Sequence, residues 1–156
     1  MSKDAVRIDV DADPTQEDIA VVRAGLRAHN QRHLPGQEWR SIALYLRDAE
    51  DRILGGVLAE IGWDWLHLSI LWVDERTRGQ GYGSRLLAAT EAEARRAGCR
   101  GVFLDTFSFQ ARPFYERNGY EVFGALEDFP AGYERYFLRK SLVGSASEQA
   151  AMKAER

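Results

Sequence analysis

The chain has 156 residues, of which 45% are hydrophobic and 29% charged, and this is the composition of a globular domain rather than of a disordered chain. A domain of this length buries about 70% of the surface that its unfolded chain exposes, and the single cysteine, Cys99, excludes a disulfide framework and a cysteine-rich zinc site. The net charge of -3 argues against nucleic acid as the main partner, because such binding depends on neutralising phosphates.

The first part of the chain predicts a strand, a helix and a β-hairpin. Residues 6–10 alternate apolar and polar side chains, as a half-buried strand does. A helical pattern follows Thr15. Two β-rich runs, 41–46 and 53–61, flank the turn-like segment 48–51 and therefore predict a hairpin.

The middle of the chain predicts a strand–helix–strand unit. Residues 65–73 and 101–105 are apolar runs typical of buried strands, and a long amphipathic helix over 83–97 lies between them, with Gly98 as its stop. Two strands joined by a crossover helix run parallel, and the crossover is right-handed. We therefore expect one parallel strand pair within an otherwise antiparallel sheet.

The helix over 83–97 is also expected to present ion pairs to solvent. Its apolar residues form one inward stripe, whereas Glu91 with Arg95 and Glu93 with Arg96 have spacings that favour helical pairs on the outer face.

The last part of the chain predicts a short helix over 111–118 and two further strands, 119–123 and 133–138. The whole indicates an α/β (α+β) domain over residues 1–142, with a central mixed, mostly antiparallel sheet of six to seven strands flanked by helices. The polar segment 143–156 is expected to be a frayed or weakly helical tail.

A glycine-rich turn, Arg78-Gly79-Gln80-Gly81-Tyr82-Gly83-Ser84, precedes the long helix. Glycines let a backbone approach a ligand closely, and the free N–H groups at a helix start bind anions. Arg76 and Arg85 add positive charge nearby. The turn lacks the Gly-Lys-Ser/Thr of a Walker A loop. Ser84 stands where a dinucleotide fingerprint has its third glycine, so both nucleotide interpretations weaken. A plain tight turn is the alternative to an anion site.

Two segments together resemble the GNAT acetyltransferase superfamily. The run Leu71-Trp72-Val73 followed by Arg78-Gly79-Gln80-Gly81-Tyr82-Gly83 is similar to the family's acetyl-CoA motif, R/Q-x-x-G-x-G/A. The later segment, residues 111–120, is similar to the family's A-x-x-L/F-Y-x-x-x-G-F/Y pattern. The resemblance runs over residues 6–142, and its specific part is 66–123.

The resemblance implies a splayed sheet whose gap, between the strands at 65–73 and 101–105, holds the pantetheine arm of acetyl-CoA. It also implies which residues bind that co-substrate. Backbone groups of Leu71, Trp72 and Val73 would pair with the pantetheine, and the turn would hold the pyrophosphate. Ser108, which stands where the family often has asparagine, completes the set with Gln110 and Phe114. The expected cofactor-binding residues are Leu71, Trp72, Val73, Arg78, Gly79, Gln80, Gly81, Tyr82, Gly83, Ser84, Ser108, Gln110 and Phe114.

The resemblance also assigns catalytic roles. Tyr115 matches the tyrosine that the family places near the thioester sulfur, so it is the candidate proton donor to the leaving thiolate. His67 lies where some members carry a carboxylate base, and a histidine suits proton relay near neutral pH. Asp64, Glu60 and Ser69 are alternative ends of a water relay. Structural roles in an aromatic core or on a strand are the alternatives for Tyr115 and His67.

The predicted function is an acetyl-CoA-dependent N-acetyltransferase that acts on a primary amine of a small molecule or protein, without a metal. The alternatives are a non-catalytic acyl-CoA-binding module and a nicotinamide-dependent oxidoreductase. No apolar leader and no run of eighteen apolar residues occurs, so we expect a cytoplasmic protein without membrane or nucleic-acid partners. Many members of the family dimerise, so a homodimer stays open.

Overall fold

The computed structural model describes residues 5–144 and divides into two compact units, 1–37 and 38–156. The first unit contains helix α1 (Gln16–Gln31). The side chain of Thr15 caps this helix by accepting a hydrogen bond from the backbone N–H of Asp18 at 3.1 Å. Within its own unit α1 buries no residue, and Val22 remains 75% exposed.

The prediction of a strand at residues 6–10 is wrong. These residues belong to no strand, and the side chains of Val6, Ile8 and Val10 are exposed. Alternating polarity makes a segment suitable for a sheet, but a strand exists only where a neighbouring strand pairs with its backbone. The sheet therefore has six strands.

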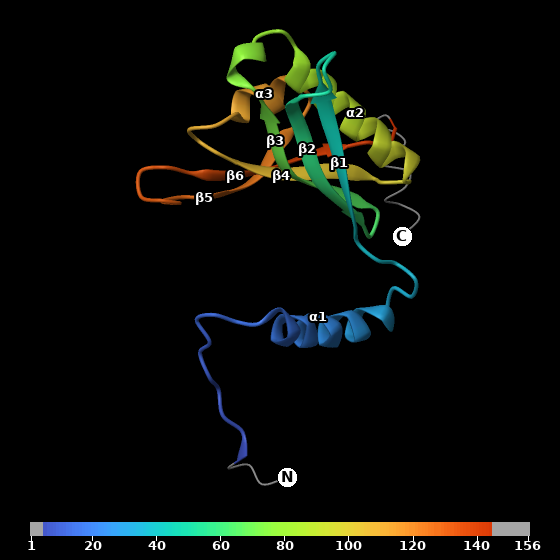
Figure 1. Ribbon diagram of the computed structural model, residues 1–156, viewed down its shortest axis with the longest axis vertical. Helices are drawn as coiled ribbons and strands as arrows, with labels where there is room; N and C mark the ends of the chain where they lie inside the picture. Colours follow the sequence, from blue (N-terminus) through green and yellow to red (C-terminus); the bar gives the residue numbers. More distant parts are fainter. Residues whose placement is uncertain (1–4, 145–156) are drawn as a thin grey trace. The chain divides into compact units, whose positions relative to one another are not determined.

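The second unit is built on one six-stranded mixed sheet in the order β1-β2-β3-β4-β6-β5 (Figure 1). Every neighbouring pair is antiparallel except β3 and β4, which run parallel, as the strand–helix–strand pattern predicts. The strands are β1 (Arg40–Arg47), β2 (Ile53–Gly62), β3 (Trp65–Val73), β4 (Gly101–Phe107), β5 (Glu121–Leu126) and β6 (Arg135–Ser141).

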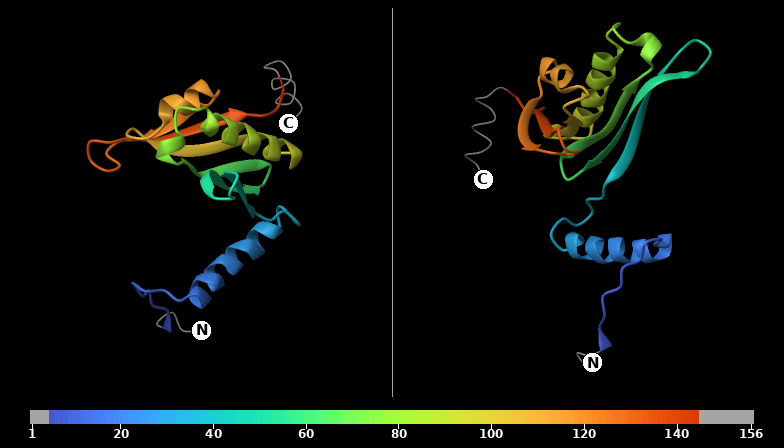
Figure 2. Two further views of the ribbon diagram at one scale, coloured as in Figure 1. Left: turned by 45° about the horizontal axis from the view of Figure 1, so that its top comes forward. Right: turned by 90° about the vertical axis from the view of Figure 1, so that its left-hand side faces the viewer.

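The crossover helix α2 (Tyr82–Arg96) packs along one face of this sheet (Figure 2). Its inward residues Leu87 and Ala94 are fully buried, together with Val57, Leu66 and Leu104 of the strands. Gly98 ends the helix with a φ of +76°, which glycine adopts without strain. Two short helices complete the unit, η2 (Glu75–Thr77) and α3 (Arg112–Arg117).

Of the two ion pairs expected on the outer face of α2, one is wrong. Glu93 pairs with Arg96 at the surface as predicted. Glu91, however, is 5% exposed, and its carboxylate accepts hydrogen bonds from Lys140 at 2.6 Å and from the Tyr120 hydroxyl at 3.2 Å. The partners come from distant parts of the chain, so helical spacing alone does not reveal them.

The parallel pair β3–β4 is short, and this opens the sheet. Residues Trp65–His67 pair with Gly101–Phe103, and beyond them the two strands separate. A bulge lies at the same place, since Ala59 pairs with Leu68 and Leu58 with Ile70, leaving Ser69 as the extra residue of β3. The predicted splay between these strands is therefore present, with Ser69 at its edge.

In residues 5–144 no helix is long and apolar enough to cross a membrane.

Candidate active site

The glycine-rich turn places a row of backbone N–H groups at the opening between β3 and β4. Gly79 and Gly81 have φ angles of +77° and +81°, and a side chain built on either would meet no atom within 4 Å. Glycine is favoured at both positions because it adopts a positive φ without strain, and not because a side chain would lack space. Gly81 is the N-cap of α2 and offers no side-chain cap, and the first intrahelical bond runs from the Arg85 N–H to the Gly81 carbonyl at 3.1 Å. The N–H groups before Arg85 come too early in the helix to bond to a helical carbonyl, so they are available to a ligand. The first turn carries no acidic residue that would repel an anion.

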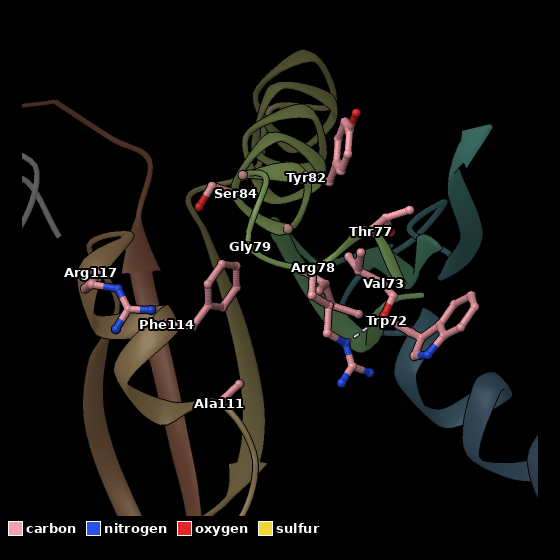
Figure 3. A pocket seen from close by; sticks show the side chains of 13 residues that line it. Trp72, Val73, Thr77, Arg78, Gly79, Tyr82, Ser84, Ala111, Phe114 and Arg117 are labelled. Atoms are coloured by element: carbon pink, nitrogen blue, oxygen red, sulfur yellow. Dashed lines mark hydrogen bonds between the residues drawn. The ribbon is translucent and has the colours of Figure 1, made fainter. Parts of the chain in front are cut away.

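These groups line a cavity of about 480 Å³. Its walls come from the end of β3, the glycine-rich turn and α3. Figure 3 shows the Phe114 ring pointing toward the glycine-rich turn, with Arg78 on one side of it and Arg117 on the other. A Cβ on Gly83 would lie 3.3 Å from the Phe114 ring, so this glycine allows close approach of α2 to α3. The lining residues are Leu71, Trp72, Val73, Thr77, Arg78, Gly79, Gly81, Tyr82, Gly83, Ser84, Ala111, Phe114 and Arg117.

Of the three arginines near the turn, Arg78 lines the cavity. Its Nε donates a 3.0 Å hydrogen bond to the carbonyl of Val73 (Figure 3). Arg76 instead pairs with Asp74 at 3.0 Å, and the hydrogen bonds from Arg76 lower the pKa of Asp74 to about 2. The guanidinium of Arg85 lies over the ring of Tyr82. The local density of arginines therefore delivers one cation to the cavity, not three.

The edge of β3 that faces β4 is open along its second half. Asp74 donates its N–H to the Leu54 carbonyl of β2 at 2.7 Å, and backbone groups alternate in direction along a strand. Trp72 therefore directs its backbone toward β2, whereas Leu71 and Val73 direct theirs toward the open edge. The bond from Arg78 to the Val73 carbonyl agrees with this direction. Of the three residues expected to offer backbone groups there, the alternation favours Leu71 and Val73.

A second cavity, of about 570 Å³, continues the opening and shares Leu71, Arg78 and Ala111 with the first. Tyr115 lines it and is 6% exposed. Burial, together with the negative charge of Asp105, raises the pKa of Tyr115 to about 12, so this hydroxyl keeps its proton at neutral pH. The lining residues are Leu68, Ser69, Ile70, Leu71, Arg78, Asp105, Thr106, Phe109, Gln110, Ala111 and Tyr115.

The remaining residues expected to bind the cofactor have other places. Ser108 joins the loop after β4 to the start of β6, since its hydroxyl accepts the Glu134 N–H at 3.1 Å. Gln110 lines the second cavity, but its side-chain carbonyl accepts the Phe107 N–H at 2.9 Å. Of the expected cofactor-binding residues, all of which the structure describes, Gln80 and Ser108 line neither cavity.

His67 is not among the described residues that line either cavity. Its ring stacks on Phe103 of β4 with centroids 4.6 Å apart, and Glu60 is its cross-strand neighbour on β2. Asp64 lies in the β2–β3 turn, where its carbonyl accepts the Arg100 N–H. Of the alternative relay residues, Ser69 is the one that lines the second cavity.

Two charged lining residues escaped the sequence analysis, Arg117 and Asp105. Arg117 is the last residue of α3. It belongs to the second family-like segment, 111–120, and that membership was the signal that could have marked it as a binding residue. Asp105 is a carboxylate near the end of a buried strand beside the predicted splay, which is a position where polar groups serve ligands.

A mixed sheet that splays between two parallel strands, with a glycine-rich helix start at the opening, is the arrangement that the resemblance to acetyltransferases implies. A model of the acetyltransferase (GNAT) family matches residues 13–120. The chain therefore belongs to this family, and the nicotinamide-dependent alternative loses its support. Acetyl-CoA is the acetyl donor of the family's acetyltransferases.

Individual proteins agree with this assignment. The chain is 40% identical over 115 residues to a blasticidin-S acetyltransferase of Streptomyces morookaense, covering 71% of this chain and 85% of that protein. A crystal structure of an acetyltransferase from Bacillus cereus matches with a TM-score of 0.77 and 35% identity, covering 86% of this chain and 98% of that one. A Bacillus anthracis structure in complex with acetyl coenzyme A shares the fold, with a TM-score of 0.60 and 20% identity, covering 66% and 63% of the two chains.

Proposed function

We propose that this acetyltransferase moves the acetyl group of acetyl-CoA to a primary amine of a small molecule. The observation that carries the proposal is the continuous opening between β3 and β4. At one end the opening has the free N–H groups of the α2 start, and farther along it has the buried hydroxyl of Tyr115. A donor for an anion and a donor for a leaving group thus lie along one path.

The residues of the first cavity fit the elongated, negatively charged co-substrate. The N–H groups at the start of α2 suit a diphosphate, and Arg78 and Arg117 supply positive charge at the same cavity. The open edge of β3 offers the carbonyl of Leu71 and the N–H of Val73 to the amides of a pantetheine arm, as a neighbouring strand would. When bound, acetyl-CoA supplies an acetyl group that is activated as a thioester.

Tyr115 acts in this proposal as the proton donor to the leaving thiolate. A thiol has an ordinary pKa of about 8.5, so the sulfur leaves more easily when it receives a proton. With a pKa of about 12, Tyr115 holds its proton across the physiological range. Leu71 lines both cavities, and its open-edge N–H would receive the negative charge that develops on the acetyl oxygen.

The acceptor amine must lose a proton before it attacks. An alkyl amine has a pKa of about 10.4, so near pH 7.4 its neutral form costs about 4 kcal/mol to reach. We assign His67 as the proton acceptor, acting through water. Ser69, two residues along β3, lines the second cavity, and its hydroxyl can hold a water between the amine and the imidazole.

A small-molecule acceptor is favoured by the 40% identity to a blasticidin-S acetyltransferase. We propose amine-bearing metabolites or antibiotics as the substrate class, and blasticidin S belongs in the first panel that is tested.

The test is acetylation of a panel of primary amines, read by mass spectrometry together with release of free CoA thiol. We expect a mass gain of one acetyl group on at least one small amine, with one thiol released for each acetyl transferred. Tight binding of acetyl-CoA without transfer to any amine would overturn the proposal and favour the non-catalytic acyl-CoA-binding module.

A further inference from the structure

We propose that Asp105 makes the acceptor site selective for amines that carry a second positive charge, with the ring of Phe109 beside it. This inference rests on the proposed function, because it concerns the acceptor end of the same opening. Both residues line the second cavity, and the sequence analysis gave Asp105 no role in binding.

Asp105 lies on the face of β4 that is turned away from the core. Along this strand Leu104 and Thr106 are buried, whereas Phe103, Asp105 and Phe107 alternate with them and are half-buried. The carboxylate therefore opens onto the side of the sheet opposite α2.

The two charged side chains that line the second cavity have opposite signs. Arg78 belongs to the part shared with the first cavity, and Asp105 belongs to the second cavity alone. A molecule bound along this opening thus meets positive charge at the diphosphate end and negative charge at the acceptor end. This polarity suits an anionic acetyl donor and a cationic acceptor.

The Asp105 carboxylate has one oxygen left for a ligand. The Nε of Arg135 donates a 2.8 Å hydrogen bond to its Oδ2, and among residues 5–144 no other side chain forms an ion pair with it. Three aromatic rings hold the Arg135 guanidinium, since those of Phe107, Phe129 and Phe137 lie 5.6, 5.0 and 5.2 Å from it. Arg135 thus orients the carboxylate, and its side chain and that of Asp105 remain 29% and 23% exposed.

Phe109 supplies an apolar surface to the cavity that this carboxylate also lines. Its ring is 59% exposed, but it stacks on Phe107 at 5.4 Å and meets Tyr133 edge-on at 5.1 Å. Neighbours on two sides therefore hold the ring in place. A cation that contacts both an aromatic face and a carboxylate gains from both interactions.

The charge that Asp105 binds is the second one, not the reacting ammonium. A carboxylate in direct contact with the reacting group would stabilise its protonated form and so oppose the attack on the acetyl carbon. A second cationic group on the same molecule carries no such penalty, and its binding places the neutral amine along the opening.

The inference is tested by calorimetric titration of the protein saturated with CoA, which has no acetyl group, so that a bound amine stays unchanged. The probes are putrescine, a diamine, and butylamine, the monoamine of equal carbon length. We expect wild type to bind putrescine at least about fivefold more tightly than butylamine, and Asp105→Asn to reduce this ratio toward one. Added salt should reduce the ratio as well.

Glu121→Gln is the matched control, because Glu121 also pairs with an arginine, Arg139, but lines neither cavity among the described residues. It should keep the wild-type ratio. Phe109→Leu, at an exposed position, tests the same site if Asp105→Asn fails to fold, and it should lower the affinity for putrescine. Equal affinities in wild type, an unchanged ratio in Asp105→Asn, or binding of CoA without either amine overturns the inference. Failure to bind CoA overturns the proposed function instead.

Discussion

The Tyr115 hydroxyl combines burial with access to the opening of the sheet. The residue is 6% exposed, its ring contacts Phe114 and Tyr120 edge-on, and it lines the second cavity. Packing thus holds the phenol in place, and the low polarity around it keeps the proton on the oxygen. A phenol in this environment stays protonated and can offer its O–H to a leaving group, and it differs from the neighbouring Tyr120, whose hydroxyl binds Glu91.

Replacing Tyr115 with phenylalanine should lower kcat about a hundredfold, because the leaving thiolate loses its proton donor while the ring keeps its packing. The dissociation constant of acetyl-CoA should change little. Steady-state kinetics and calorimetry check both values. Tyr120→Phe is the control, since it removes a buried hydroxyl outside the opening. A kcat loss of equal size in Tyr120→Phe would make the effect one of packing.

Replacing His67 with glutamine should remove the acidic limb of the pH profile of kcat/KM. A protonated imidazole cannot accept a proton, so activity that depends on His67 falls as the pH decreases. Glutamine keeps a polar side chain next to Phe103 but does not titrate. His33→Gln, at an exposed position in the first unit, should leave the profile unchanged. If His67→Gln keeps the wild-type limb, the proton acceptor is another group.

At the scale of elements, one buried charge network joins three parts of the second unit. Lys140 of β6 donates to the carboxylate of Glu91 on α2 at 2.6 Å and to the Asn118 carbonyl after α3 at 2.9 Å. The hydroxyl of Tyr120 binds the other oxygen of Glu91. The network therefore links α2, whose start lines the first cavity, to the segment that carries Tyr115.

Replacing Lys140 with methionine should reduce the free energy of unfolding by about 3 to 5 kcal/mol, because the Glu91 carboxylate then stays buried without its cation. Urea denaturation measures this change. Adding Glu91→Gln to Lys140→Met should recover part of the loss, since no charge remains buried. Arg139→Met is the control on the same strand. It breaks an exposed pair with Glu121, and so it should cost less than about 1 kcal/mol. Similar losses in the two single variants would contradict this account.

At the scale of the whole molecule, local signals predicted more than long-range ones. The strand at 65–73, the helix after the glycine turn and the parallel pair were all predictable, because each depends on periodicity or connection rules within one segment. The absence of a strand at 6–10 was not predictable, since a strand forms there only if another strand pairs with it. The buried position of Glu91 likewise depends on Lys140, 49 residues away.

The candidate site divides in the same way. The glycine turn and Tyr115 lie in contiguous motifs, and so their residues were identifiable from the chain alone. The role proposed for Asp105 depends on its contact with Arg135, 30 residues away, and on the separation of β3 from β4. Such a juxtaposition exists only after folding, and no spacing rule along the chain describes it.

The short contact between β3 and β4 has a consequence for how acceptor preference can change. Three residue pairs join the halves β1–β3 and β4–β6, and the rest of each half is held by its own antiparallel ladders. Beyond that seam no ladder of hydrogen bonds joins β3 to β4 among the described residues, so the side chains along the gap and the packing of α2 across both halves set its width. Under the proposed function, substitutions along the gap would change the acceptor preference while the hydrogen-bonded ladders on either side stay intact.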